Sequence, residues 1–363
     1  MTANLFAPPE PLPLAEKLKA YNLPDNLMLP VADKWVLVSN LQKCVRRGLV
    51  KTAQATSLRL LEIDADYFWR RLPVIAMEDI GFGNPALCLD VLKTFRRKKL
   101  HDELGVERLA LYFVEQLAGS LKSRALCEAI VMIEYCVRQE ELAAHFKAMT
   151  DTQLLGQTNN HGLPFIERLL ALRHLCGYRE YAHGRSTTVA KARPDLMREI
   201  VWQFGLDDVE AQMFLRGQGC THDLNIAVPL VAEMLHAGEV NEQRTKLEQE
   251  SVNGILLAAL DQYSRIGKRC LAEFSRTEPM RELLDRWQGV DSVAVVSRAV
   301  FAIEGGCLDR WLVFSGSDGL HEQLNRYYLE RVGFTDEQYQ KVLTHTAQHL
   351  GLLNDIRKNA LAN

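Results

Sequence analysis

Long apolar runs are missing from this sequence of 363 residues. No segment approaches the roughly 18 consecutive apolar residues that a membrane-spanning helix requires. The N-terminus also lacks a basic region followed by an apolar core, so it does not resemble an export signal. We therefore expect a cytoplasmic protein that is neither inserted in a membrane nor exported.

Paired cysteines and an excess of one charge are missing too. The eight cysteines include no Cys-x-x-Cys pair and no regular spacing, which disfavours both a zinc ribbon and a secreted disulfide framework. The formal net charge is −3, with 25% charged residues. This balance disfavours a generally polycationic protein, so any contact with DNA has to come from a local patch.

Proline becomes rare beyond residue 30, whereas six of the twelve prolines lie before that point. Because proline fixes φ and removes an amide donor, residues 1–34 are predicted to form an extended, proline-rich arm. Downstream, apolar residues recur at helical spacing, as in Leu126, Ile130 and Ile133, and alternating strand patterns are nearly absent. The sequence predicts an all-α fold.

Turn-forming residues divide the helical part of the chain. At roughly 100–200 residues per domain, the length allows two domains. We predict a first helical domain over 35–184, a linker over 185–194 and a second helical domain over 195–363. Thr335, followed by acidic residues, is expected to cap one late helix. The helices predicted in the second domain are 195–216, 224–237, 242–274, 279–288, 291–304, 319–332 and 335–350.

Two stretches of the first domain resemble a known family. They are VSNLQKCVRRG at 38–48 and FWRRLPVIAMEDIGFGNP at 68–85. Both are similar to the helical collar of the replication-associated recombination ATPases, the RarA/MgsA/WHIP family, which are relatives of the clamp loaders. The resemblance implies a clamp-loader-collar-like fold. The residues that match the family's pattern are Gln42, Lys43, Arg46, Arg70, Arg71, Leu72, Ile75, Ala76, Glu78, Asp79, Ile80, Gly81 and Pro85.

Two further segments extend the resemblance to about residues 35–184. GYREYAHG at 177–184 is similar to the ending of the family's collar. Two residues depart from the pattern: Arg124 replaces the usual asparagine, and Pro73 lies in a helix that the family leaves free of proline. Pro73 predicts that its helix either begins near Leu72 or is kinked. In LAGSLKSRALCEAI, the matching residues are Leu117, Ala118, Lys122, Ser123 and Ala125.

The family's ATP-hydrolysing module is not found in this sequence. No G-x-x-x-x-G-K-[ST] motif occurs, and the single Gly-Lys pair, Gly267-Lys268, lies in a helical context. Without a glycine loop for the phosphates and a hydroxyl for Mg²⁺, we expect no ATP hydrolysis and no cofactor. The collar holds the family's subunits together as tetramers that work at stalled replication forks. The resemblance therefore implies a non-catalytic, homo-oligomeric scaffold or adaptor, of a type that mobile elements often carry, for DNA or for a replication or repair protein.

Basic residues cluster in two regions. Residues 31–60 carry six basic side chains against one acid, and a second cluster lies at 93–99. If each cluster converges on one face, it would neutralise phosphates and give salt-sensitive binding to DNA. The alternative is a solvated helix surface or a set of internal salt bridges. The candidate DNA contacts are Lys43, Arg46, Arg47, Arg96, Arg97, Lys98, Lys99 and Lys122.

The adjacent carboxylates of Glu78 and Asp79 allow two interpretations. They could act as acid and base or bind Mg²⁺, but neighbouring helical residues point about 100° apart, so the pair alone cannot cage a metal. We favour a structural role. One carboxylate is expected to pair with Arg46, Arg70 or Arg71, and the other to accept backbone hydrogen bonds where the helix ends at Gly81. No catalytic residue is predicted.

Two histidine patterns match metal sites only loosely. His345 and His349 are four residues apart on an expected helix, but no glutamate follows the first histidine. A second set would match the ordered ligands of a helical metal-dependent phosphohydrolase, although its Cys-Thr-His-Asp segment is equally typical of a capping loop. We predict no metal site. The second set consists of His183, His222, Asp223 and Asp261.

Three hypotheses about function remain open from the sequence. The first is a scaffold that binds DNA during replication or recombination. The second is a protein-only inhibitor or adaptor of a cellular ATPase or replication complex. The third is the metal-dependent phosphohydrolase. In each, the tyrosines of GYREYAHG are expected to pack on the collar, and the cysteines to be buried in the core.

Overall fold

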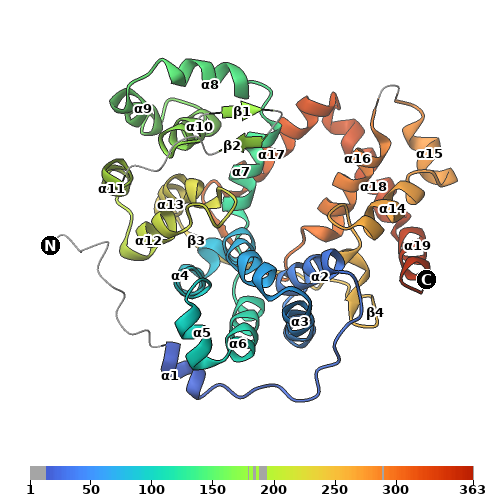
Figure 1. Cartoon of the computed structure of the whole chain (residues 1–363). Coiled ribbons are helices and arrows are strands. Elements are labelled where there is room, and N and C mark those ends of the chain that lie inside the picture. The colour runs from blue at the N-terminus through green and yellow to red at the C-terminus, as the bar shows by residue number, and fades with distance from the viewer. Residues whose placement is uncertain (1–13, 179, 183–184, 188–193, 288–289, 363) are drawn as a thin grey trace.

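The computed structural model describes residues 14–178, 180–182, 185–187, 194–287 and 290–362. Helices dominate these residues, and the strands among them form two-stranded sheets, which confirms the all-α prediction (Figure 1). An antiparallel pair of strands, β1 (Glu180–Ala182) and β2 (Arg185–Thr187), ends the first half. The helices and helical turns before it are α1 (Leu14–Lys19), α2 (Lys34–Arg46), α3 (Val50–Ile75), η1 (Ala76–Ile80), η2 (Gly81–Gly83), α4 (Pro85–Thr94), α5 (Lys98–Leu104), α6 (Val106–Gly119), α7 (Ala125–Tyr135), α8 (Gln139–Lys147), α9 (Asp151–Thr158) and α10 (Phe165–Leu175).

The second half is also mainly helical, with four short strands. These are β3 (Val240–Arg244), β4 (Ser251–Val252), β5 (Ile255–Leu256) and β6 (Arg310–Phe314). Its helices and helical turns are α11 (Pro194–Gln203), α12 (Asp208–Arg216), η3 (Leu224–Ala227), α13 (Val228–His236), η4 (Leu257–Ala259), α14 (Arg265–Phe274), α15 (Glu278–Leu284), α16 (Ser292–Val300), η5 (Phe301–Gly305), α17 (Ser317–Val332), α18 (Asp336–Gln348) and α19 (Leu350–Ala362).

Two of the predicted helices are wrong in detail. The helix predicted over 195–216 is two helices, α11 and α12, separated near Gly205, whose φ is 58°. The N-terminal part of 242–274 forms β3, β4 and β5. Asn253 and Gly254, with φ of 50° and 78°, join β4 to β5, and Asn-Gly is a favourable hairpin turn. β3 pairs with β6, which lies far along the chain, so local periodicity gives no sign of it.

Pro73 lies inside α3. The helix begins at Val50, so a start near Leu72 is wrong. The break in its backbone is at Asp64, where φ is −159° and ψ is 80°. There the carboxylate accepts a hydrogen bond from the amide of Tyr67 at 2.9 Å, as a helix cap does. α3 therefore consists of two helical stretches, and Pro73 belongs to the second.

The N-terminal cap predicted at Thr335 is confirmed. The amide of Gln338 donates to the Thr335 hydroxyl at 3.2 Å, and the Gln338 side chain accepts from the Thr335 amide at 2.8 Å. Asp336 and Glu337 occupy the first turn of α18, where negative charge complements the helix dipole.

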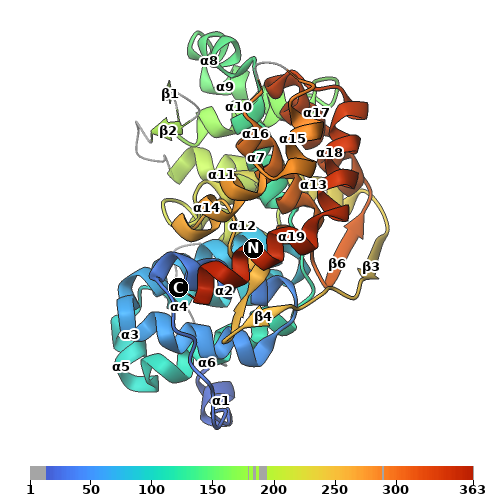
Figure 2. The same ribbon diagram turned by 90° about the vertical axis from the view of Figure 1, so that its right-hand side faces the viewer.

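One hydrophobic core contains side chains from both halves of the chain, including Leu37, Phe113, Phe274 and Leu320. α17 packs on α7 (Figure 1), and η4 and β5 pack on α2. β3 lies beside β6 (Figure 2). The two-domain division remains a prediction, since 188–193 of the proposed linker and 1–13 of the arm lie outside the described residues. Within the expected extended arm, α1 forms a helix that buries Leu14 and Leu18, because these apolar side chains find partners in the core.

Candidate functional site

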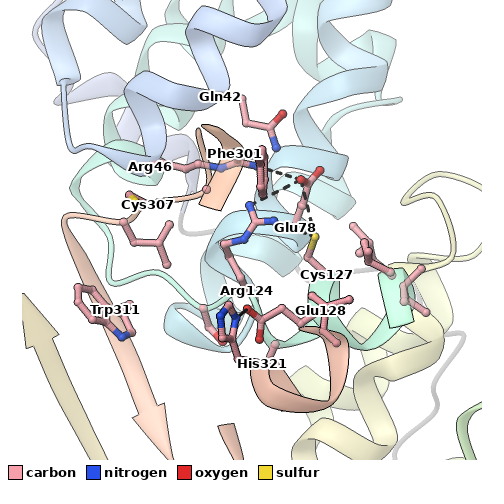
Figure 3. Close-up of a pocket in the computed structure, with 18 of the residues that line it drawn as sticks. Gln42, Arg46, Glu78, Arg124, Cys127, Glu128, Phe301, Cys307, Trp311 and His321 are labelled. Carbon is pink, nitrogen blue, oxygen red and sulfur yellow. Dashed lines mark hydrogen bonds and ion pairs between the residues drawn. The ribbon is translucent and has the colours of Figure 1, made fainter. Parts of the chain in front are cut away.

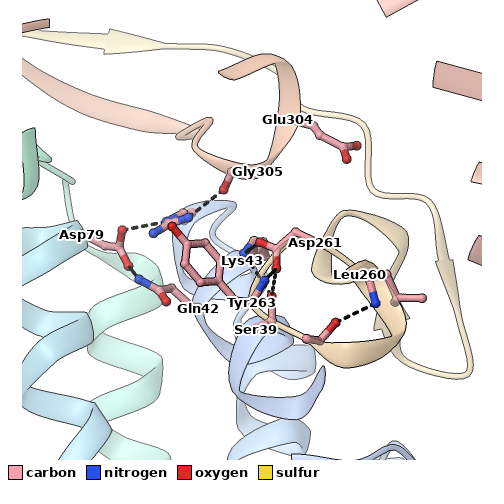
Figure 4. A network of polar contacts seen from close by, with 12 residues as sticks. Ser39, Gln42, Lys43, Asp79, Leu260, Asp261, Tyr263, Glu304 and Gly305 are labelled. Atoms are coloured by element: carbon pink, nitrogen blue, oxygen red, sulfur yellow. Dashed lines mark hydrogen bonds and ion pairs between the residues drawn. The ribbon is translucent and has the colours of Figure 1, made fainter. Parts of the chain in front are cut away.

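A buried ion network holds the family-like motif together. Arg46 on α2 donates from Nε to Asp79 Oδ1 at 2.7 Å and from Nη2 to Glu78 Oε1 at 2.9 Å. Its Nη1 donates to the carbonyl of Gly305 at 2.7 Å (Figure 4). Arg46 is 1% exposed and Asp79 is fully buried. One guanidinium group therefore joins α2, η1 and η5, which are far apart in the sequence.

Three more side chains complete the network. Arg124 Nη1 donates to Asp79 Oδ1 at 3.0 Å, and Gln42 Nε2 donates to Asp79 Oδ2 at 2.8 Å. Arg71 Nη2 lies 3.4 Å from Glu78 Oε2 and donates to Gln42 Oε1 at 2.7 Å. Figure 3 shows Arg124 directed at Glu78. Both carboxylates are therefore paired with guanidinium groups.

The expected structural role of the carboxylates agrees with this network only in part. Glu78 pairs with Arg46 and Arg71, as predicted. The predicted backbone hydrogen bonds to the second carboxylate, Asp79, are wrong, because its oxygens accept hydrogen bonds from side chains of α2 and of the start of α7 instead. Arg70 lies instead 5.8 Å from the ring of Tyr67. In the sequence, Arg124 is notable only as a departure from the family pattern. Its pairing with Asp79 is seen only in the tertiary structure.

Gly81 and Pro85 occupy positions that suit these residue types. Gly81 has φ of 45°, and a Cβ there would lie 3.2 Å from the carbonyl oxygen of Ser123. Pro85 is the first residue of α4, where a missing N–H leaves no helical hydrogen bond unmade. Asn84 caps the same helix by accepting from the amide of Leu87 at 3.1 Å. Both residues shape the turn between η1 and α4.

The network also sets protonation states. Burial alone would raise the pKa of Glu78, but Arg71, Arg46 and Arg124 lower this pKa to about 2. Burial raises the pKa of the nearby Cys127 thiol to about 12. A permanently charged, fully paired carboxylate is poorly suited to proton transfer, and a protonated thiol is a weak nucleophile. The arrangement suits a structural role.

Four of the eight predicted DNA contacts are buried, which corrects their assignment. Three of them lie on α2 or directly after it, and helical spacing places all three on the inward face of the helix. Their partners there are carboxylates and carbonyl groups. Lys43 pairs with Asp261 (Figure 4), and Lys122 Nζ lies 2.8 Å from Asp309 Oδ1. Inside the protein these charges cannot reach a phosphate. The four are Lys43, Arg46, Arg47 and Lys122, between 0% and 5% exposed.

The other four candidates, Arg96, Arg97, Lys98 and Lys99, are exposed around the start of α5. Two of them line a pocket of about 400 Å³, called here the basic pocket. No carboxylate is among the described residues that line it. α12, which packs on α4, contributes Arg216, a residue that sequence reasoning missed because nothing local connects it to the cluster. The lining residues are Leu92, Lys93, Phe95, Arg96, Arg97 and Arg216.

A larger cavity of about 900 Å³ lies where the two halves of the chain meet (Figure 3). Its walls come from α2, α3, η1, α7, η5, β3, β6 and α17. Glu128 and His321 face each other on one wall at 3.0 Å, and this hydrogen bond raises the pKa of His321. The aromatic side chains that line the cavity are Trp35, Tyr67, Tyr135, Tyr263, Phe301, Trp311 and Phe314.

The histidine patterns do not form a metal-binding group in the described part of the chain. Asp223 lies 3.2 Å from Arg173, and Asp261 pairs with Lys43, so the two carboxylates belong to separate ion pairs. His183 lies outside the described residues. The His345 Nε2 donates to the Pro279 carbonyl at 2.8 Å, and the His349 Nδ1 donates to the His345 carbonyl at 2.9 Å.

The tyrosine of the collar-like part and most cysteines are buried. Tyr178 is 3% exposed, which confirms that it packs on the collar-like part. All eight cysteines are free thiols, and six are buried, as predicted; Cys220 and Cys307 are partly exposed.

No protein-family model matches the chain, and neither a curated protein nor a solved structure is significantly similar to it. The likeness to the recombination ATPases therefore depends on the motif residues alone. Over the residues that the structure describes, no helix is both long and apolar enough to cross a membrane.

We expect Arg46→Ala to lower the free energy of unfolding by about 3–5 kcal/mol, because it leaves buried carboxylates short of a cation. Urea denaturation measures the change. Lys341→Ala is the control: Lys341 pairs with Glu337 at 2.7 Å on the surface, and its loss should change stability by less than about 1 kcal/mol. Equal effects of the two substitutions would contradict a central role for Arg46.

The low pKa of Glu78 predicts sensitivity to acid. This pKa is about 2 in the folded protein, below its ordinary value of 4.5, so ionised Glu78 stabilises the fold above about pH 4.5. That contribution is lost as the pH falls towards about 2. In urea titrations, Glu78→Gln should be less stable than the wild type near neutral pH, and the difference should narrow towards about pH 3. A difference that stays constant with pH would contradict the paired, ionised state.

Proposed function

We propose that this protein is a non-catalytic scaffold that binds DNA during replication or recombination. The observation that carries the proposal is the basic pocket with its exposed neighbours Lys98 and Lys99. Its four cations come from two separate parts of the chain, the end of α4 with the turn that follows it and the end of α12, and no carboxylate is among the described residues that line the pocket. Such a surface attracts phosphates without reading base sequence, and its affinity falls steeply with salt.

The family-like motif supports a scaffold rather than an enzyme. Its carboxylates, Glu78 and Asp79, are paired with guanidinium groups, and the sequence has no phosphate-binding glycine loop. The network instead holds helices from distant parts of the chain in one arrangement. In the recombination ATPases the collar also has a structural role, since it holds subunits together.

We further propose that the protein acts as a homo-oligomer, as the collar resemblance implies. Several copies would combine weak phosphate-binding surfaces into one stronger site. Light scattering coupled to size exclusion should give a mass that is a multiple of 41.2 kDa. A single-chain mass at every concentration up to about 100 µM, near the range of weak biological association, would contradict this part of the proposal.

The DNA-binding surface is tested by reversing two charges. We expect Arg96→Glu with Arg97→Glu to raise the Kd for duplex DNA at least about tenfold at low salt, because two phosphate contacts become repulsive. The slope of log K against log salt concentration should become shallower by about 2. Fluorescence anisotropy with a labelled duplex measures both quantities.

A matched control reverses two exposed arginines elsewhere, Arg281→Glu with Arg286→Glu on and just after α15. This variant has the same net charge as the test variant, so it separates a local site from general attraction. Equal losses in the two variants would contradict a specific basic pocket. Absence of DNA binding by the wild type, with a protein that co-purifies stably, would favour the protein-only adaptor.

A further inference from the structure

The lining of the large cavity includes an aromatic pair beside cations. Trp35 and Tyr67 both line the cavity, and their rings meet edge to face at 5.5 Å. Lys34 Nζ lies 5.0 Å and 4.8 Å from the two ring centroids, and the Arg70 guanidinium lies 5.8 Å from the Tyr67 ring. Trp35 is 43% exposed, so part of its large apolar ring has no partner in the fold.

Exposed aromatic rings beside cations are what unpaired nucleotides bind. Every base has a flat π-face that stacks on tryptophan or tyrosine, and each stacked base adds affinity without requiring a particular sequence. Arg70 forms no ion pair with any described residue, so its charge is available to a phosphate; Lys34 already pairs with Asp64 at 3.0 Å. The site therefore favours stacking over strong phosphate binding.

The cavity that this pair lines has the size and polar groups for a base. Its volume of about 900 Å³ lies within the usual range of ligand pockets. Gln243, Thr245 and Gln262 contribute side chains that both donate and accept hydrogen bonds. His222 also lines the cavity, and burial lowers its pKa, so its neutral ring can donate or accept. A base edge presents both kinds of group.

The basic pocket and the large cavity are connected by one short segment. Arg216 lines the basic pocket and His222 lines the large cavity. Six positions of chain span at most about 20 Å, which bounds the distance between the two backbone positions. A strand of several nucleotides covers this range, as in single-strand-binding domains.

We propose that the large cavity receives an unpaired base of a single DNA strand whose phosphates lie at the basic pocket. The inference rests on the proposed DNA-binding function and deepens it by naming the form of DNA. Duplex DNA would contact only the basic pocket, because its bases are already stacked. The protein should therefore bind a single strand more tightly than a duplex of equal length.

The test compares Trp35→Ala with the wild type on a labelled oligothymidine of about 15 nucleotides and on a duplex of equal length, by anisotropy at fixed salt. We expect Trp35→Ala to weaken single-strand binding at least about fivefold, the effect of one lost stacked base, and to leave duplex binding unchanged. Trp35→Phe, which keeps an aromatic face, should restore most of the affinity. Trp202→Ala, at an exposed tryptophan outside the cavity lining, is the matched control.

Each outcome separates this inference from the proposed function. Unchanged single-strand binding by Trp35→Ala, with duplex binding that still depends on Arg96 and Arg97, would overturn the base-binding cavity and leave the scaffold proposal standing. If the Arg96 and Arg97 variant loses both kinds of binding while Trp35→Ala loses neither, the base-binding cavity is overturned in the same way. If free thymidine monophosphate displaces the labelled strand as well as unlabelled strand does, the cavity binds a free nucleotide, and the proposal of a single-stranded DNA ligand is overturned.

Discussion

The buried guanidinium of Arg46 is the contact on which the arrangement of this protein depends. A charge removed from water is costly unless its partners are well placed, and Arg46 has two carboxylates and a backbone carbonyl within 2.9 Å. These partners come from η1 and η5. The pairing is favourable only when both elements are in position, so it selects one packing of α2 against the rest of the chain.

Other buried charges repeat this pattern across the two halves. Lys43 pairs with Asp261, Lys122 with Asp309, and Arg357 with Glu304. The first two join the collar-like part to the second half, so their charges are occupied in holding the halves together. The large cavity lies at this junction. Of the cations predicted to contact DNA, those that remain exposed are in the cluster around Arg96 and Arg97.

The difference between buried and exposed cations explains which of them the proposed function assigns to DNA. A phosphate binds cations that lack a carboxylate partner, whereas a paired cation has little left to gain. Lys43, Arg46 and Lys122 belong to the second group. The basic pocket belongs to the first, and in the proposal the aromatic pair of the large cavity adds attraction of a different kind, through stacking. Under the proposed function, the two surfaces together would favour a single strand over a duplex.

Local patterns in the sequence determined the all-α class, the cap at Thr335 and the turn at Gly81–Pro85, because apolar spacing, caps and turns act within a few residues. The structural role of Glu78 beside Arg46 also followed from residue types that pair at short range. Only the tertiary structure decided which cations are buried, since Lys43 and Arg97 look alike until Asp261 is placed beside one of them. It also decided that β3 pairs with β6 and that Arg216 joins the basic pocket. These contacts connect segments far apart in sequence, and helical periodicity carries no information about such distances.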